Sequence, residues 1–210
     1  MDLRAALADR RLLAIVRGKD PDAALRTVLA LVEEGIDLIE VSLSSADALG
    51  VLARSAAELG PDRPIGAGTV LTADDAHAAR DAGAAFAVTP GLGAGADTAR
   101  HLGLPVLAGV MTPTDIITAQ THGADALKLF PAAQAGGPAY LKALRAPFPE
   151  ALFVPVGGVD LEAARAYLAA GATAIGVGSP LIADAADGGS LNTLRKRARA
   201  FRSTVEETTA

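Results

Sequence analysis

Short apolar and β-branched runs alternate with longer alanine- and leucine-rich segments along the whole chain. The short runs are nearly continuous in apolar residues, which is typical of strands buried on both faces of a parallel sheet. The pattern predicts eight strands, at residues 12–17, 38–43, 65–70, 86–89, 106–110, 126–130, 153–156 and 174–178. Eight strand–helix units predict an α/β fold, a (β/α)8 TIM barrel, with a doubly wound open sheet as the alternative.

The segments between the strands carry the start and stop signals of helices. Polar residues are predicted to cap four helix starts: Asp20, Thr72, Thr112 and Asp160. Glycines in the left-handed conformation are predicted to end six helices: Gly35, Gly60, Gly83, Gly103, Gly123 and Gly171. A terminal helix is predicted at about residues 190–207, with the basic cluster 195–199 on its solvated side.

Composition limits the class of protein. The chain has 210 residues, of which 50% are hydrophobic and 3% aromatic, so we expect one barrel domain over residues 1–210 with an aliphatic core. The absence of cysteine excludes disulfides, cysteine nucleophiles and thiolate metal sites. The formal net charge of -5 argues against a nucleic-acid partner.

Neither targeting nor membrane insertion is expected. The start of the chain lacks the basic-then-apolar layout of a signal peptide. The longest uncharged run, residues 166–183, is interrupted by glycines and a proline, so it does not predict a membrane span. We therefore expect a cytoplasmic protein with no membrane partner.

Candidate chemistry lies at the carboxyl ends of the predicted strands, where such barrels build their active sites. Lys128 interrupts an apolar run, and burial there would favour a neutral, nucleophilic amine. A lysine whose ammonium reaches solvent at a strand end is the structural alternative for that residue alone. Glu40 is a second ionisable residue within an apolar strand, and Arg17 and Thr69 stand at neighbouring strand ends. Two ionisable residues within apolar strands of one barrel, Lys128 and Glu40, predict a coupled acid–base site.

Glycine pairs follow the last two predicted strands, in residues 156–159 and 176–179. Glycine permits tight turns as well as close approach of backbone amides to an anion, so the pairs alone favour neither reading. Their position after strands seven and eight favours a phosphate site. The glycine-rich residues 91–96 superficially match a dinucleotide-binding loop, but no acidic residue ends the next strand, so a flexible loop is expected there.

Metal and serine-hydrolase chemistry are weakly supported. The three histidines lie in predicted helices or at their ends, without metal-ligand spacing on one helix face: His77, His101 and His122. No Gly-x-Ser-x-Gly motif occurs. We therefore expect no metal ion and no cofactor.

Eight motifs, in order along most of the chain, resemble the class I aldolases that act on 2-keto-3-deoxy-6-phosphogluconate (KDPG) and 4-hydroxy-2-oxoglutarate (KHG). They are Ala-Ile-Val-Arg at 14–17, Leu-Ile-Glu-Val at 38–41, Gly-Ala-Gly-Thr-Val at 66–70, Val-Thr-Pro at 88–90, Gly-Val-Met-Thr-Pro-Thr at 109–114, Leu-Lys-Leu-Phe-Pro at 127–131, Pro-Val-Gly-Gly-Val at 155–159 and Gly-Val-Gly-Ser at 176–179. The resemblance implies an aldehyde lyase that reversibly cleaves KDPG to pyruvate and D-glyceraldehyde 3-phosphate. It also implies a homotrimer and a role in carbohydrate metabolism of the Entner–Doudoroff type.

The resemblance also implies the roles of individual residues. Lys128 matches the lysine that forms a Schiff base with the substrate, and Glu40 matches the general acid/base. Arg17 and Thr69 match the groups that hold the carboxylate of the pyruvate portion. The remaining matches line the site or hold the phosphate: Pro90, Phe130, Gly157, Gly158, Gly178 and Ser179.

Three positions depart from the commoner family pattern and leave the preferred C4 configuration open. Ser44 stands where many members have arginine, Ala108 where proline is frequent, and Val156 matches the branch that acts on 6-phosphogalactonate. Residues 111–114, 129–131 and 147–149 look more like the gluconate branch, which we place first. 2-Keto-3-deoxy-6-phosphogalactonate and KHG aldolases are the alternatives within the family. Alternatives of another class are a phosphosugar isomerase or synthase barrel and a non-catalytic phosphosugar-binding barrel.

Overall fold

One eight-stranded parallel sheet forms the centre of the molecule in the computed structural model, which describes residues 1–208. The strand order is β7-β6-β5-β4-β3-β2-β1-β8, so the two ends of this order must meet to close a barrel. The strands are β1 (Leu12–Val16), β2 (Ile39–Ser42), β3 (Ile65–Gly68), β4 (Ala87–Val88), β5 (Val106–Val110), β6 (Ala126–Leu129), β7 (Phe153–Pro155) and β8 (Ile175–Val177).

The barrel closes between β7 and β8 through a short junction. Val156 and Gly176 form an isolated parallel bridge, and the amide of Thr173 donates to the carbonyl of Phe153 at 2.9 Å. The predicted (β/α)8 barrel is therefore confirmed, and the open-sheet alternative is wrong. Each predicted strand is present, although all except β5 are one or two residues shorter than predicted. The shortening is proportionally largest in β4, which consists of Ala87 and Val88 alone.

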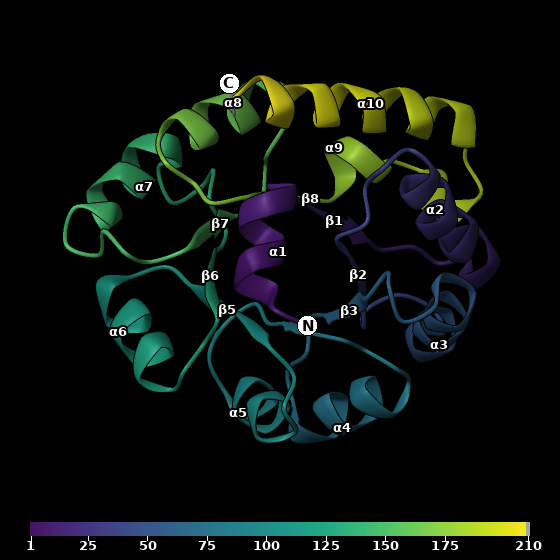
Figure 1. Cartoon of the computed structure of the whole chain (residues 1–210), viewed down its shortest axis with the longest axis horizontal. Helices are drawn as coiled ribbons and strands as arrows, with labels where there is room; N and C mark the ends of the chain where they lie inside the picture. The colour runs from purple at the N-terminus through teal and green to yellow at the C-terminus, as the bar shows by residue number, and fades with distance from the viewer. Residues whose placement is uncertain (209–210) are drawn as a thin grey trace.

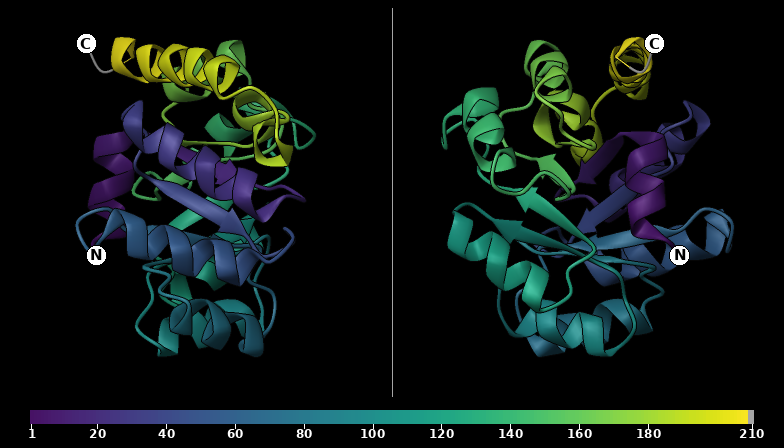
Figure 2. Two further views of the ribbon diagram at one scale, coloured as in Figure 1. Left: turned by 90° about the vertical axis from the view of Figure 1, so that its right-hand side faces the viewer. Right: turned by 60° about the vertical axis from the view of Figure 1, so that its left-hand side comes forward.

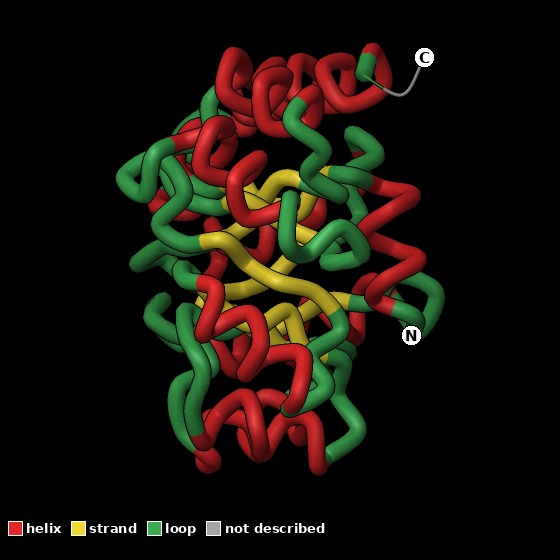
Figure 3. The backbone as a smooth tube through the Cα atoms, turned by 90° about the vertical axis from the view of Figure 1, so that its left-hand side faces the viewer, coloured by secondary structure: helices red, strands yellow, loops and turns green. Residues whose placement is uncertain are grey.

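Helices α2 to α8 and α10 surround the strands as an outer layer (Figures 1, 2 and 3). The helices are α1 (Leu3–Arg10), α2 (Pro21–Glu33), α3 (Ala48–Leu59), α4 (Ala73–Asp81), α5 (Ala94–His101), α6 (Pro113–Thr121), α7 (Gly137–Arg145), α8 (Leu161–Ala169), α9 (Ser179–Ile182) and α10 (Leu191–Glu207), with a 3-10 turn at Ala185–Asp187. The predicted terminal helix corresponds to α10. The predicted domain ran to residue 210, and residues 209 and 210 lie outside the described part of the chain.

The predicted helix signals act as expected. Asp20 and Asp160 accept hydrogen bonds from first-turn amides, and Thr72 and Thr112 each form a reciprocal capping box with the aspartate three residues later. The six predicted terminating glycines all have positive φ: Gly35, Gly60, Gly83, Gly103, Gly123 and Gly171. These local signals set where each helix begins and ends between successive strands.

The amino-terminal end of the barrel is covered by α1, which lies across the centre of the strand ring in Figure 1. Leu3 and Leu7 of α1 are buried and belong to the same apolar cluster as the interior side chains of the strands. That interior cluster includes Leu13, Leu38, Phe86, Leu107, Ala126, Val154 and Ala174. α1 and this cluster therefore fill the amino-terminal end of the barrel interior.

Two sequence expectations are corrected by the structure. The glycine-rich residues 91–96 are not wholly a flexible loop, since α5 begins at Ala94 and Gly95 packs against the backbone of Leu71. The basic cluster of α10 is not wholly solvated either: Arg197 donates to the carbonyls of Leu181 and Ile182. Periodicity alone does not distinguish an arginine that caps a neighbouring helix from one in water.

Within residues 1–208, none of the helices combines the length and the apolar character needed to cross a bilayer.

Candidate active site

A cavity of about 820 Å³ opens at the carboxyl ends of the strands. Every residue predicted to form the site lines it: Arg17, Glu40, Thr69, Pro90, Lys128, Phe130, Gly157, Gly158, Gly178 and Ser179. The fold therefore brings together residues that are spread over more than 160 positions of the sequence.

Glycines on the strands provide the space for this cavity. Side chains on a strand alternate between the barrel interior and the helix layer, so Glu40 shares the interior face with Leu38, and Lys128 shares it with Ala126. Gly68 lies on β3 and pairs with Ser42 of the neighbouring strand β2. A Cβ at position 68 would lie 2.5 Å from Oε1 of Glu40. The missing side chain at position 68 is what gives the Glu40 carboxylate room inside the barrel.

Lys128 extends from β6 into this interior, where its side chain is 6% exposed. Its Nζ lies 5.1 Å from the centre of the Phe130 ring. Burial lowers the pKa of Lys128 below its ordinary value; the negative charge of Glu40 opposes this shift and the positive charge of Arg17 adds to it. A neutral amine at this position is a candidate nucleophile.

Glu40, on β2, is 1% exposed, and its Oε2 has no hydrogen-bond partner within residues 1–208. Burial raises the pKa of Glu40 above its ordinary value, and the positive charges of Lys128 and Arg17 oppose that shift. An unpaired buried carboxylate oxygen costs free energy unless a ligand or water meets it. A carboxylate with a raised pKa is a stronger base than an ordinary one and is a candidate for proton exchange with a ligand.

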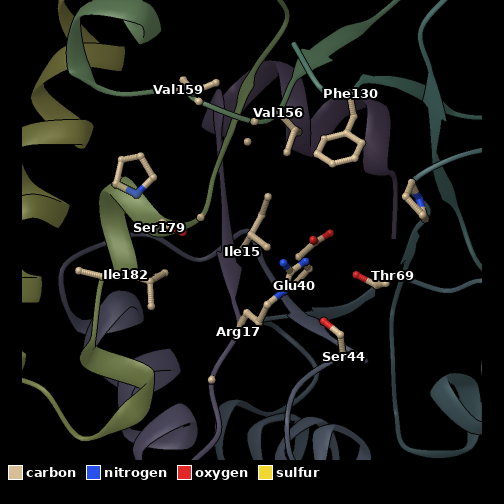
Figure 4. Close-up of a pocket in the computed structure, with 18 of the residues that line it drawn as sticks. Ile15, Arg17, Glu40, Ser44, Thr69, Phe130, Val156, Val159, Ser179 and Ile182 are labelled. Carbon is tan, nitrogen blue, oxygen red and sulfur yellow. The ribbon is translucent and has the colours of Figure 1, made fainter. Parts of the chain in front are cut away.

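Hydroxyl groups and a guanidinium form one side of the cavity. Nε of Arg17 donates to Oγ of Ser42 at 3.3 Å, and that oxygen lies 2.8 Å from both Ser44 Oγ and Thr69 Oγ1. Thr69 has φ of 61°, which is rare for a β-branched residue and costs about 1–3 kcal/mol. Arg17, Ser44 and Thr69 gather around Glu40 in Figure 4. This end of the cavity can bind a carboxylate.

The opposite side of the cavity is built largely from backbone. Gly157 and Gly158 have φ of 99° and 74°, values that other residues rarely adopt. Gly178 and Ser179 follow β8, and Ser179 lies across the cavity from Thr69 in Figure 4. Backbone amides in glycine-rich turns form concave sites for phosphate-like anions.

Sequence reasoning missed several residues of the cavity and its support. Lys19 and Asp187 also line the cavity, and the Lys19 amide donates a 2.6 Å hydrogen bond to the Asp187 carboxylate. Ser42, which holds both Arg17 and Thr69, was also missed. The available signal for Ser42 was its position two residues after Glu40, since residues i and i+2 of a strand face the same side.

The histidines lie away from this cavity and are exposed on the helix layer: His77, His101 and His122. His122 pairs with Asp97 at 2.9 Å. Among residues 1–208, no three histidine, aspartate or glutamate side chains are grouped so as to hold a metal ion.

A TIM barrel with a buried lysine and a buried glutamate in one cavity at its carboxyl end is suited to an enzyme that forms an imine with a carbonyl substrate. A sequence model described as KDPG and KHG aldolase matches residues 3–193 of this chain. The chain therefore belongs to the KDPG and KHG aldolase family, as its motifs predicted, and is an aldolase.

Individual relatives agree with this assignment. A 2-dehydro-3-deoxy-phosphogluconate aldolase of Pseudomonas aeruginosa is 42% identical over 67% of this chain, a match that spans only 64% of that relative's length. A 2-dehydro-3-deoxy-6-phosphogalactonate aldolase of Escherichia coli is 38% identical over 81% of this chain and 83% of its own. A KDPG aldolase of Legionella pneumophila, solved with pyruvate captured as a covalent carbinolamine, is 30% identical. It superposes with a TM-score of 0.87 over 94% of this chain and 97% of that chain.

Proposed function

We propose that this protein reversibly cleaves 2-dehydro-3-deoxy-6-phosphogluconate, the compound abbreviated KDPG, to pyruvate and D-glyceraldehyde 3-phosphate. The observation that carries the proposal is that Lys128 and Glu40 line the same cavity and are both almost fully buried, with each charge acting on the pKa of the other group. The matching name of the Pseudomonas aeruginosa relative supports the choice of substrate.

Lys128 is the proposed nucleophile. Its neutral amine attacks the C2 ketone of the substrate, and loss of water from the carbinolamine gives an iminium ion. When the C3–C4 bond breaks, its electron pair moves to the iminium nitrogen and leaves an enamine of pyruvate. Protonation of C3 and hydrolysis then release pyruvate and regenerate the amine.

Glu40 is the proposed general acid/base. Its carboxylate takes the proton of the C4 hydroxyl, directly or through one water, while C4 becomes the aldehyde carbon of glyceraldehyde 3-phosphate. The unpartnered Oε2 and the raised pKa of Glu40 support this role, because a more basic carboxylate accepts a proton more readily and an unpaired oxygen is free to meet the substrate.

The remaining residues are proposed to orient the two ends of the substrate. Arg17 and Thr69 hold the carboxylate next to C2, while Pro90 and Phe130 pack against the carbon chain. The phosphate lies at the glycine-lined end formed by Gly157, Gly158, Gly178 and Ser179. The separation of the two ends across the cavity supports this orientation (Figure 4).

The galactonate analogue, which differs only at C4, is the alternative substrate. It is favoured by Val156, which lines the cavity, and by the name of the Escherichia coli relative. Steady-state kinetics with both phosphorylated acids decides between them. A higher kcat/KM for the gluconate supports our ranking, and a higher value for the galactonate reverses it.

The mechanism is tested by incubating the protein with labelled pyruvate and sodium borohydride, followed by peptide mapping. We expect a stable adduct at Lys128 and no adduct in Lys128→Met. Lys142→Met is the matched control, because Lys142 is exposed on α7 and is expected to leave labelling unchanged. Aldol cleavage without an adduct, or an adduct at another lysine, contradicts the mechanism.

We also propose that the catalytic unit is a single domain that acts in the cytoplasm as a homotrimer in carbohydrate metabolism. Four large apolar side chains are exposed on the loops after β3, β4 and β5 and on α6: Leu71, Leu92, Met111 and Ile117. Exposed apolar side chains on the loops of three consecutive strands support self-association. Light scattering coupled to gel filtration tests the oligomeric state; a monomer at micromolar concentration argues against the trimer.

A further inference from the structure

Ser42 is the centre of the hydrogen-bond network at the carboxylate end of the cavity. It lies on β2, is fully buried, and does not itself line the cavity. Its Oγ receives the hydrogen bond from Arg17 Nε at 3.3 Å and lies 2.8 Å from both Ser44 Oγ and Thr69 Oγ1. One buried hydroxyl therefore touches both residues assigned to the substrate carboxylate.

The atoms of this network allow only two arrangements of protons. A serine hydroxyl has one proton to donate and two lone pairs to accept with. The guanidinium of Arg17 can only donate, so it uses one lone pair of Ser42. Of Ser44 and Thr69, one must then donate to Ser42 and the other must accept from it. Hydrogen bonds are therefore donated either from Ser44 to Ser42 and from Ser42 to Thr69, or in the reverse direction.

A bound carboxylate selects between these arrangements. A carboxylate oxygen only accepts hydrogen bonds, so Thr69 must turn its proton toward the ligand. Thr69 then accepts from Ser42, and Ser42 accepts from Ser44. In the same arrangement Arg17 uses Nε within the protein and keeps both terminal amino groups for the ligand. One arrangement of hydroxyl protons thus leaves both Thr69 and Arg17 with donors for the ligand.

We propose that Ser42 is a positioning residue that aligns Arg17 and Thr69 to bind the carboxylate of pyruvate and the equivalent carboxylate of KDPG. The proposal rests on the proposed function, since it assumes that the carboxylate binds at this end. The unusual φ of Thr69, 61°, supports it, because the hydrogen bond to Ser42 helps to hold a conformation that threonine rarely adopts. Ser44 supplies the donor at the exposed end of the network.

The test compares Ser42→Ala with Ser55→Ala. Ser55 is also fully buried, but its Oγ has no hydrogen-bond partner, so the control removes the same atom from an equally buried site outside the network. The half-saturation concentration of pyruvate in borohydride labelling and the KM for KDPG are measured for each. We expect Ser42→Ala to raise both by the same factor of about 5–30, the effect of losing one or two hydrogen bonds, with kcat changed less than about 3-fold.

Further variants separate positioning from folding. Ser42→Thr keeps the hydroxyl and is expected to restore most of the affinity. Thr69→Val removes the partner, so adding Ser42→Ala to it is expected to cost less than Ser42→Ala costs in the wild type. Ser44→Ala, at the exposed end, is expected to raise the half-saturation concentration by a smaller factor, about 2–5. This last variant remains informative if Ser42→Ala does not fold.

The possible results distinguish the two proposals. If the wild type is labelled at Lys128 but Ser42→Ala and Ser44→Ala behave like Ser55→Ala, the positioning role is wrong while the proposed function stands. An effect confined to kcat, or fully additive with Thr69→Val, also overturns the positioning role. If the wild type forms no pyruvate adduct, both proposals fall together.

Discussion

The carboxylate of Glu40 occupies the space that a side chain at position 68 would fill. Gly68 lies beside β2 in the adjacent strand, and a Cβ added to it would be 2.5 Å from Oε1 and 2.6 Å from Cδ of Glu40. Real Cβ atoms do not approach a carboxylate this closely, so one of the two must move. The position of the proposed acid/base therefore depends on the absence of a methyl group on its neighbour.

Gly68→Ala is expected to displace Glu40 and lower kcat by about 10²-fold or more, because a positioned acid/base contributes about 10²–10⁴-fold to the rate. Gly91→Ala is the matched control, since Gly91 has ordinary φ and no atom within 4 Å of its added Cβ. Turnover of KDPG and thermal unfolding are measured for both. Full activity of a folded Gly68→Ala variant would show that the Glu40 position does not matter.

Glu40→Gln is expected to lower kcat for KDPG cleavage by about 10²–10⁴-fold while pyruvate labelling at Lys128 persists. The amide keeps the shape of the side chain but cannot accept the C4 hydroxyl proton. Parallel measurement of turnover and borohydride labelling separates the two steps. Loss of both to the same degree would instead assign Glu40 to imine formation.

The pH dependence of pyruvate labelling reports the protonation of Lys128. Because burial lowers its pKa, we expect the rate to rise with pH along a limb whose midpoint lies below 10.5, the ordinary value for lysine. The positive charge of Arg17 contributes to this lowering, so Arg17→Met is expected to move the midpoint to higher pH. An unchanged midpoint in Arg17→Met argues against this electrostatic coupling. The limb is read at saturating pyruvate because Arg17 also affects binding.

The two buried ionisable groups are expected to reduce stability. Replacing both, as Glu40→Gln with Lys128→Met, is expected to raise the free energy of unfolding at pH 7 by about 1–4 kcal/mol, the usual gain when a buried charge pair is removed. Urea denaturation measures this difference. A double variant that is less stable than the wild type would mean that the pair supports the fold.

Comparison of the double variant with Glu40→Gln alone isolates Lys128. The folded pKa of Lys128 is lowered, so between that pKa and 10.5 the unfolded chain binds more protons than the folded one, and stability rises with pH. The destabilising contribution of Lys128 is therefore full below the folded pKa and disappears as the pH approaches 10.5. The stability difference between the two variants is expected to shrink accordingly.

Arg197→Met is expected to weaken binding of the phosphorylated substrate more than binding of pyruvate. Arg197 donates to the carbonyls of Leu181 and Ile182 at 2.6 and 3.0 Å and thereby holds α9, whose first residue is Ser179. We expect the KM for KDPG to rise about 5-fold or more, as for a lost charged hydrogen bond, with unchanged half-saturation by pyruvate. Arg199→Met is the control, because Arg199 pairs instead with Glu34, the residue that follows the last residue of α2. Equal effects of both variants contradict the prediction.

Much of the fold was predictable because its signals are local. Apolar runs fixed the eight strands, and capping residues such as Thr72 fixed helix starts through hydrogen bonds within one turn. The amino-terminal helix α1 was not predicted, because only Leu3 and Leu7 of its eight residues are buried and its pattern is weak. The position of α1 depends on its contact with the end of the barrel. That end is formed by residues distant in sequence, so a local sequence pattern does not predict the contact.

The site was predictable in part for the same reason. Lys128 and Glu40 stood out as ionisable residues in apolar runs, and both line the cavity. Ser42 did not stand out, since a serine is unremarkable in a strand until Arg17 and Thr69, from two other parts of the chain, meet it. The role of Arg197 was hidden likewise, because its carbonyl partners belong to a different helix.

The junction between β7 and β8 gives the substrate a structural role as well as a chemical one. β8 pairs with β1 over three residues, whereas it meets β7 through the bridge between Val156 and Gly176. In the proposed orientation the carboxylate is held from β1 to β3 and the phosphate from the turns after β7 and β8. A bound substrate thus contacts both ends of the strand order, β7 and β8. Because binding to the folded state stabilises it, substrate binding is expected to stabilise the β7–β8 junction, the narrowest in the barrel wall.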